Sequence, residues 1–147
     1  MSIVFQIQTD DLVDVAQIVQ KMKPYLLNGT VFLLDGDLGS GKTTFVSCLM
    51  DDYGFKDSSS PTYSLINTYN TSSGQKITHV DLYRLKDDED IDSSGFWDIF
   101  SDHNRIIFIE WASKVDSSLW PLDWKIFQIE IKKQQEKRLY IFSKLQS

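Results

Sequence analysis

Apolar residues recur along the chain in short runs whose spacing predicts alternating strands and helices. Residues 30–34 are an uncharged, mostly apolar run, and residues 106–109 are four consecutive apolar residues. Both are typical of parallel strands that are buried on two faces. Residues 3–9 alternate instead, with Ile3, Phe5 and Ile7 on one side. That pattern predicts an edge strand or a half-buried strand.

Two segments have the spacing of helices. The first is predicted after Thr9 or Asp10, either of which can cap it, and it ends by Pro24. The second is predicted over residues 44–50. The apolar faces consist of Leu12, Val15, Val19 and Met22 in the first helix, and of Phe45, Cys48 and Leu49 in the second.

Four later segments have the composition of strands and are separated by turn residues. Residues 63–69 and 76–83 are predicted to pair around a turn at residues 71–74. Residues 124–131 and 138–142 form a second predicted pair, with its turn near residues 134–135. At 147 residues, the chain is expected to form a single domain over residues 1–147.

A glycine-rich segment lies between the first buried run and the second helix. Residues 36–43 read Gly-Asp-Leu-Gly-Ser-Gly-Lys-Thr and match G-x-x-x-x-G-K-[ST], the pattern of phosphate-binding loops. Such a loop wraps its backbone N–H groups around a phosphate, with Lys42 on the β- and γ-phosphates and the Thr43 hydroxyl on Mg²⁺. A strand before the loop and a helix after it are the context that the motif requires, so we expect nucleotide phosphate binding.

Acidic residues at the ends of two predicted strands are candidates for the rest of the site. Glu110 follows the apolar run 106–109 in a Walker B pattern, so it is the best candidate to orient a water or bind Mg²⁺. Asp81 is a second candidate, with a strand-end cap or a partner for Arg84 as the alternative. We interpret His79 as a packing residue because no second His or Cys stands at ligand spacing. Trp111 either belongs to the core or lines the site.

Residues 57–62 are polar and have no apolar anchor, which leaves two interpretations. The segment is either a surface loop or a nucleotide-sensing switch in which the Thr62 hydroxyl meets the γ-phosphate or Mg²⁺.

Composition excludes several classes of protein. A net charge of -6 argues against a general nucleic-acid binder. The short basic cluster of Lys132, Lys133, Lys137 and Arg138 is interpreted as a solvated hairpin end, with a local RNA contact as the alternative. The single cysteine, Cys48, excludes an internal disulfide, fits a reducing cytosol and is predicted to be buried. No apolar run approaches membrane-spanning length, and the first residues lack the features of a signal peptide, so we expect a cytoplasmic protein.

With these residues in place, the chain resembles the TsaE family, small bacterial ATPases needed for threonylcarbamoyladenosine modification of tRNA. Four blocks carry the resemblance: residues 36–45, 60–65, 79–85 and 109–111. The loop alone is generic, but the four blocks in this order are specific. One departure is Ala112, where the family usually has Pro, so the loop after Glu110 is expected to differ in shape.

The resemblance implies an α/β P-loop NTPase fold with a mixed central sheet flanked by helices, and it implies ATP and Mg²⁺ as ligands. Lys42, Asp81 and Glu110 are implied to be catalytic, and Thr43, Asp81 and Glu110 to hold the metal. The implied nucleotide contacts are Thr9, Asp37, Leu38, Gly39, Ser40, Gly41, Lys42, Thr43, Thr44, Thr62, Trp111 and Arg138. Thr9 and Arg138 rest on a weaker alignment than the others.

The resemblance also implies partners. Members of the family act with TsaB and TsaD, of which TsaD transfers the threonylcarbamoyl group, and ATP hydrolysis resets the complex between turnovers. The acidic composition agrees with tRNA being contacted indirectly, through the complex.

Two other functions fit parts of the sequence. A small-molecule or nucleotide kinase needs a second substrate pocket and usually cationic lid residues, whereas this chain has three arginines and no obvious lid insertion. A GTPase switch or a catalytically silent adaptor is the other alternative, although no N-K-x-D guanine signature occurs.

Overall fold

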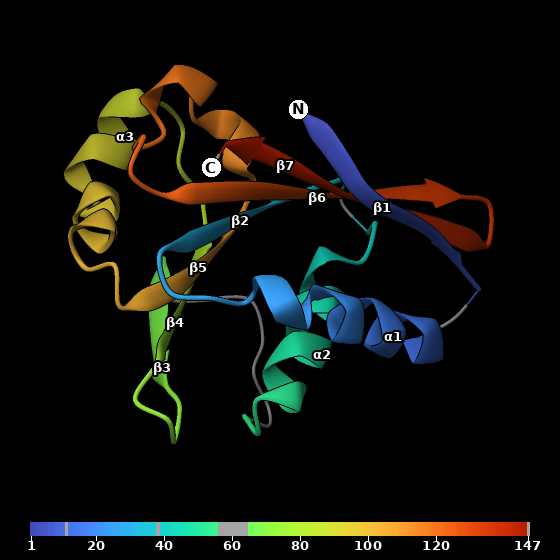
Figure 1. The fold of residues 1–147 in the computed structure, drawn as a ribbon. Helices are drawn as coiled ribbons and strands as arrows, with labels where there is room; N and C mark the ends of the chain where they lie inside the picture. The colour runs from blue at the N-terminus through green and yellow to red at the C-terminus, as the bar shows by residue number, and fades with distance from the viewer. Residues whose placement is uncertain (11, 38, 56–64, 147) are drawn as a thin grey trace.

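A single mixed sheet organises the part of the chain that the structure describes. The structure is a computed structural model and describes residues 1–10, 12–37, 39–55 and 65–146. Within these ranges the sheet has seven strands in the order β1-β7-β6-β2-β5-β4-β3 (Figure 1). Their bounds are β1 Ser2–Thr9, β2 Thr30–Asp35, β3 Ile66–Asn70, β4 Lys76–Asp81, β5 Arg105–Glu110, β6 Lys125–Gln134 and β7 Lys137–Gln146.

The four central strands are parallel and the flanks are antiparallel. β2 pairs in parallel with both β5 and β6, and β4 pairs in parallel with β5. The pairs β1–β7, β6–β7 and β3–β4 are antiparallel. The carboxyl ends of the four parallel strands therefore meet at one edge of the sheet, which is where ligands bind in open α/β sheets.

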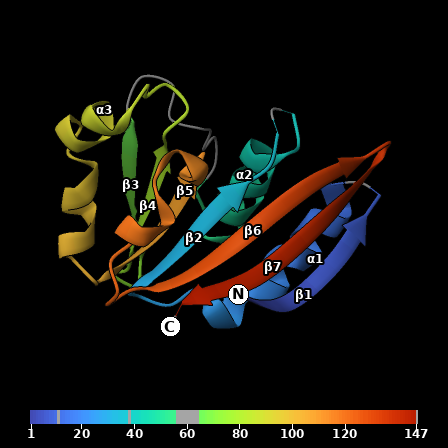
Figure 2. The same cartoon turned by 90° about the horizontal axis from the view of Figure 1, so that it is seen from above.

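Helices and short turns cover the sheet on both faces (Figures 1 and 2). Helices α1 (Leu12–Met22) and α2 (Lys42–Asp52) pack on one face around Phe32 and Phe108, whose rings stack with centroids 5.0 Å apart. Helix α3 (Asp88–Ser93) and several 3-10 turns pack on the other face around Phe96 and Trp120. The turns are Phe96–Ser101, Ala112–Lys114 and Ser117–Leu119, and a further one, Lys23–Tyr25, follows α1.

The predicted elements are present, and several differ in extent. Helix α2 begins at Lys42, two residues earlier than predicted, and β4 ends at Asp81. The last two strands have ten residues each, longer than predicted. The end of β6 was missed because residues 132–134 are polar and exposed, which hides the strand pattern. The start predicted for the third strand, residues 63–64, lies outside the described residues.

The prediction that Cys48 is buried is wrong, because the side chain is only half-buried at the edge of the core beneath α2. Partial burial, together with the nearby Asp51 carboxylate, raises the pKa of the thiol.

Within the described residues, no helix is both long and apolar enough to cross a membrane.

Candidate functional site

The loop between β2 and α2 is shaped by glycines. Gly36, Gly39 and Gly41 have φ values of 150°, 79° and 112°, in the region that side chains rarely adopt. A Cβ atom on Gly36 would lie 2.6 Å from the Ser40 hydroxyl and 2.7 Å from the Ile131 carbonyl oxygen. The loop therefore closes against β6, and α2 begins directly after it at Lys42. This geometry directs the N-terminus of the helix toward the loop.

Two acidic residues lie beside the loop because β4 and β5 are parallel neighbours. Asp81 and Glu110 end these strands and are paired in register. Leu34, one residue before the end of β2, is paired with Glu110 on its other side. The order of strands thus places both carboxylates next to the phosphate-loop motif, as expected for Walker-type acids.

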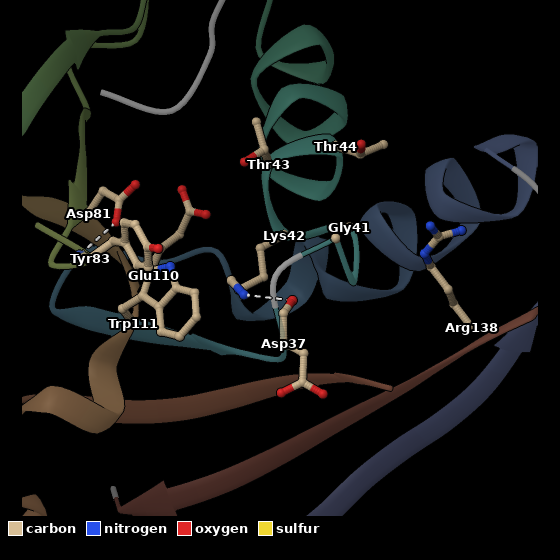
Figure 3. A pocket seen from close by; sticks show the side chains of 11 residues that line it. Asp37, Gly41, Lys42, Thr43, Thr44, Asp81, Tyr83, Glu110, Trp111 and Arg138 are labelled. Carbon is tan, nitrogen blue, oxygen red and sulfur yellow. Dashed lines mark hydrogen bonds between the residues drawn. The ribbon is translucent and has the colours of Figure 1, made fainter. Parts of the chain in front are cut away.

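A cavity of about 320 Å³ lies where these elements meet (Figure 3). Its lining consists of Asp37, Gly39, Gly41, Lys42, Thr43, Thr44, Asp81, Tyr83, Glu110, Trp111 and Arg138. Ten of these residues were site candidates from sequence, and Tyr83 was missed. It stands inside the sequence block 79–85, two residues after Asp81, and that spacing was the only signal for it.

Lys42 lies among carbonyl groups and against an aromatic ring. Its ammonium group donates hydrogen bonds to the carbonyl oxygens of Gly36 and Asp37, the latter at 3.1 Å. The Nζ atom is 4.3 Å from the centroid of the Trp111 ring. Desolvation lowers the pKa of Lys42, while the carboxylates of Glu110 and other nearby acids oppose that effect. The side chain is thus a partly desolvated cation that faces the cavity.

Asp81 is a carboxylate in an unfavourable position. Burial raises its pKa most strongly, and the neighbouring Glu110 carboxylate raises it further. The backbone N–H of Tyr83 donates a hydrogen bond of 3.0 Å to its Oδ1 and opposes the shift (Figure 3). Asp81 therefore does cap its strand end, as the alternative interpretation had it, and it also lines the cavity.

His79 is buried, as its interpretation as a packing residue requires, and its ring also makes a polar contact. Its ring is buried, and Nε2 lies 2.7 Å from Oε2 of Glu110, which is itself 2% exposed. The two residues are 31 positions apart in sequence and lie on different strands, so no local pattern could reveal the contact.

Trp111 lines the site instead of filling the core. Its backbone is left-handed, with a φ of 60°, which is uncommon for a large side chain. The ring contacts Tyr83, with centroids 4.9 Å apart, on the side of the cavity that Asp81 and Glu110 occupy (Figure 3). Lys114 donates to the carbonyl oxygen of Tyr83 at 2.6 Å and so joins the turn after Trp111 to this pair.

Arg138 bounds the opposite end of the cavity (Figure 3). Its Nε donates to the carbonyl oxygen of Ser40 at 2.7 Å, which links β7 to the loop. Thr9 is paired with Arg138 in register and bonds to its carbonyl oxygen at 3.5 Å. Thr9 and Ser40 are buried and do not line the cavity. The remaining two candidates, Leu38 and Thr62, lie outside the described residues.

The chemistry of the lining suits a phosphate chain with a hard divalent cation. Lys42 and the start of α2 supply positive charge, while Thr43, Asp81 and Glu110 supply the oxygen ligands that Mg²⁺ prefers. No group of three or more His, Cys, Asp or Glu side chains that could hold a metal occurs in the described part of the chain.

The sheet order, the glycine loop before α2 and the acids on the neighbouring strands define a P-loop NTPase fold, as predicted. A solved structure of YdiB from Bacillus subtilis superposes on this chain with a TM-score of 0.72. The superposition covers 98% of this chain and 88% of the YdiB chain, at 23% sequence identity, and it supports the fold.

Sequence comparisons identify the family. The model for "Threonylcarbamoyl adenosine biosynthesis protein TsaE" matches residues 9–140. Proteins called tRNA threonylcarbamoyladenosine biosynthesis protein TsaE are similar to the chain in several bacteria. The one from Borreliella burgdorferi is 38% identical over 71% of this chain and 74% of its own length. The one from Aquifex aeolicus is 34% identical over 89% of this chain and 90% of its own length. The one from Haemophilus influenzae is 43% identical over 55% of this chain and 51% of its own length, so that match spans about half of the relative.

The chain belongs to the TsaE family, as its sequence blocks suggested.

Proposed function

We propose that this protein binds ATP with Mg²⁺, hydrolyses it to ADP and phosphate, and thereby serves the bacterial modification of tRNA to threonylcarbamoyladenosine at adenosine 37. The observation that carries the proposal is the convergence in one cavity of Lys42 and Thr43 with the carboxylates of Asp81 and Glu110. These are the parts that phosphoryl transfer in a P-loop protein needs.

In the proposed complex, the loop and the start of α2 bind the phosphate chain. Lys42 exchanges its bonds to the Gly36 and Asp37 carbonyls for bonds to the β- and γ-phosphate oxygens. Thr43, Asp81 and Glu110 fit Mg²⁺ by the chemistry of their oxygens, and the bound ion would neutralise charge that develops on the phosphates.

Glu110 is proposed to orient the attacking water. It ends β5 at the wall of the cavity, opposite the end that Arg138 bounds. Trp111 and Tyr83 stand beside it and limit access of bulk water. On this arrangement the γ-phosphate lies toward the acids and the nucleoside toward Arg138, whose bond to Ser40 steadies the loop.

TsaB and TsaD are the proposed partners, and hydrolysis is proposed to reset their complex between turnovers. The relatives' names support a role in the tRNA pathway. The net charge of -6 supports an indirect contact with tRNA, which the partners would hold, and the proposal includes a cytoplasmic location.

The test is ATP hydrolysis with Mg²⁺, measured alone and with a matched TsaB–TsaD pair plus tRNA. We expect weak activity alone and a clear rise with the pair. Equal rates in both cases would contradict the partnership. Transfer of the phosphate to a small acceptor instead of water would favour a kinase.

A further inference from the structure

A buried polar contact joins the site to His79 of β4. His79 lies in β4 and is 1% exposed, and its Nε2 is 2.7 Å from Oε2 of Glu110. In the strand register His79 stands opposite Phe108, so the ring reaches diagonally to the residue two positions farther along β5. The side chains of His79, Asp81 and Glu110 thus share the face of the sheet that α2 covers.

The direction of this hydrogen bond follows from the groups involved. A carboxylate oxygen only accepts, so a hydrogen bond to the ionised form of Glu110 requires that Nε2 of His79 carries the proton and donates it. The other ring nitrogen, Nδ1, is buried and has no partner in the described part of the protein. A buried acceptor without a partner is less unfavourable than a buried N–H without one, which agrees with a ring protonated at Nε2.

The bond has a geometric consequence for Glu110. The last torsion of a glutamate side chain is soft, so a carboxylate on its own rotates widely. A donor that holds Oε2 fixes this rotation and therefore also the direction of Oε1. Catalytic carboxylates and metal ligands work only when such supporting contacts hold them in the productive geometry.

We propose that His79 is a positioning residue of the site, which acts by holding the Glu110 carboxylate in the orientation needed for hydrolysis. This inference rests on the proposed ATPase function and deepens it. The competing explanation is that the pair only stabilises the fold, and the variants below separate the two.

Three substitutions vary the donor. His79→Gln places an amide N–H as many bonds from Cα as Nε2, whereas His79→Asn places it one bond short, at the reach of Nδ1. His79→Met keeps bulk without a donor. We expect kcat with the partners to fall about 10- to 100-fold in the Asn and Met variants, while KM changes less than about threefold. The Gln variant should recover much of the rate.

A matched control uses the only other histidine. His103 also contacts a carboxylate, with Nε2 2.9 Å from Oδ2 of Asp123, but it is half-exposed and does not line the cavity. His103→Gln should leave kcat unchanged. The inference would be overturned if kcat fell as much in His103→Gln as in His79→Asn. It would also be overturned if the kcat of all three His79 variants fell only in proportion to their loss of thermal stability.

A double-mutant cycle tests whether His79 acts through Glu110. In a Glu110→Gln background, His79→Asn should cost no further factor in the single-turnover rate, because the group that it positions is already lost. If the double variant lost the product of the two single-variant factors in single-turnover rate, the positioning role would be overturned.

A second measurement does not depend on turnover. In protein labelled with ¹⁵N-histidine, the His79 ring should give a downfield-shifted NMR resonance for the proton on Nε2. The His103→Gln variant should retain this resonance, and the Glu110→Ala variant should lose it. Absence of this proton resonance would overturn the inference even if His79→Asn failed to fold.

If the wild type hydrolysed no ATP with its partners while this proton resonance was present, the proposed function would fail and the contact would stand. If the wild type hydrolysed ATP and His79→Asn matched its kcat, the proposed function would stand and the positioning role would fail.

Discussion

Lys42 is a buried cation that lies among carbonyl oxygens of its own loop and against the face of Trp111. These contacts hold the ammonium group at the cavity, where a phosphate would meet it already partly desolvated. Glu110 faces it from β5, and its carboxylate is the largest of the charges that offset the desolvation of Lys42. At the scale of single residues, the site is an arrangement of opposite charges around one cavity.

Replacement of Lys42 by Ala should remove phosphate affinity. Loss of charge-assisted hydrogen bonds worth about 1.5–3 kcal/mol predicts a drop in ATP and ADP affinity of about 10- to 150-fold. Titration with either nucleotide in the presence of Mg²⁺ measures the effect. Unchanged affinity would contradict the role of Lys42.

Glu110→Ala should separate binding from hydrolysis. The phosphate loop is intact in this variant, so nucleotide binding is partly retained, while the group proposed to orient water is gone. Equilibrium binding and single-turnover hydrolysis distinguish the two effects. Unchanged turnover would exclude a catalytic role for Glu110.

At the scale of elements, the loop from Gly36 to Gly41 is fixed by what surrounds it. The Ile131 carbonyl of β6 contacts it closely on one side, and Arg138 of β7 binds it at Ser40. Its shape therefore depends on strands that come much later in the sequence, as well as on its own glycines.

Two glycine substitutions in this loop should differ in cost. An added Cβ at Gly36 meets the backbone oxygen of Ile131 at 2.7 Å, whereas one at Gly39 meets no atom within 4 Å. Both positions have positive φ, so Gly39→Ala should lower the free energy of unfolding by about 1 kcal/mol and Gly36→Ala by about 2–4 kcal/mol. Urea denaturation gives both values, and equal losses would show that the contact with β6 does not constrain the loop.

At the scale of the whole molecule, the sheet brings two carboxylates together at the ends of adjacent strands. Asp81 and Glu110 are paired in register, and burial and their mutual repulsion make the charged form of Asp81 unfavourable. The fold accepts this cost at its functional edge, where a cation would offset it. Stability and the proposed activity are therefore in conflict at Asp81.

The Asp81→Asn variant should be more stable than the wild type at neutral pH without divalent cations. The raised pKa means that the folded protein holds the Asp81 proton more tightly than the unfolded chain does. The stabilisation linked to that proton is complete below the ordinary pKa of 3.8 and is lost as pH rises through the folded pKa. The amide cannot ionise and still accepts from Tyr83, so we expect a melting temperature about 1–3 °C higher at pH 7.

That difference should shrink as the pH approaches 4, and thermal melts with a chelator present would measure it. A wild type that is at least as stable as the variant at every pH would show that the two carboxylates do not destabilise the fold.

Local patterns in the sequence encode much of this molecule. The phosphate-loop motif and the apolar run before Glu110 are contiguous in the chain, and the family resemblance together with these patterns predicted the fold and most of the cavity lining. The contacts of His79 with Glu110 and of Arg138 with Ser40 depend on strand order and register, which periodicity does not specify. Cys48 illustrates a related limit, since helical spacing gave its face but not its distance from the rim of the core. The catalytic, metal-binding and nucleotide-binding roles of all the site residues stay predictions, and Leu38 and Thr62 lie outside the described residues.

The bond between Arg138 and Ser40 has a consequence for how the protein is made. The two residues are 98 positions apart, so a ribosome adding about 5–20 residues per second synthesises the loop about 5–20 s before its arginine. During that interval the nascent chain holds the complete glycine motif without the wall that β7 provides. The proposed binding of nucleotide should therefore begin only after the β6–β7 hairpin has left the exit tunnel and docked, which would make it a late event in biogenesis.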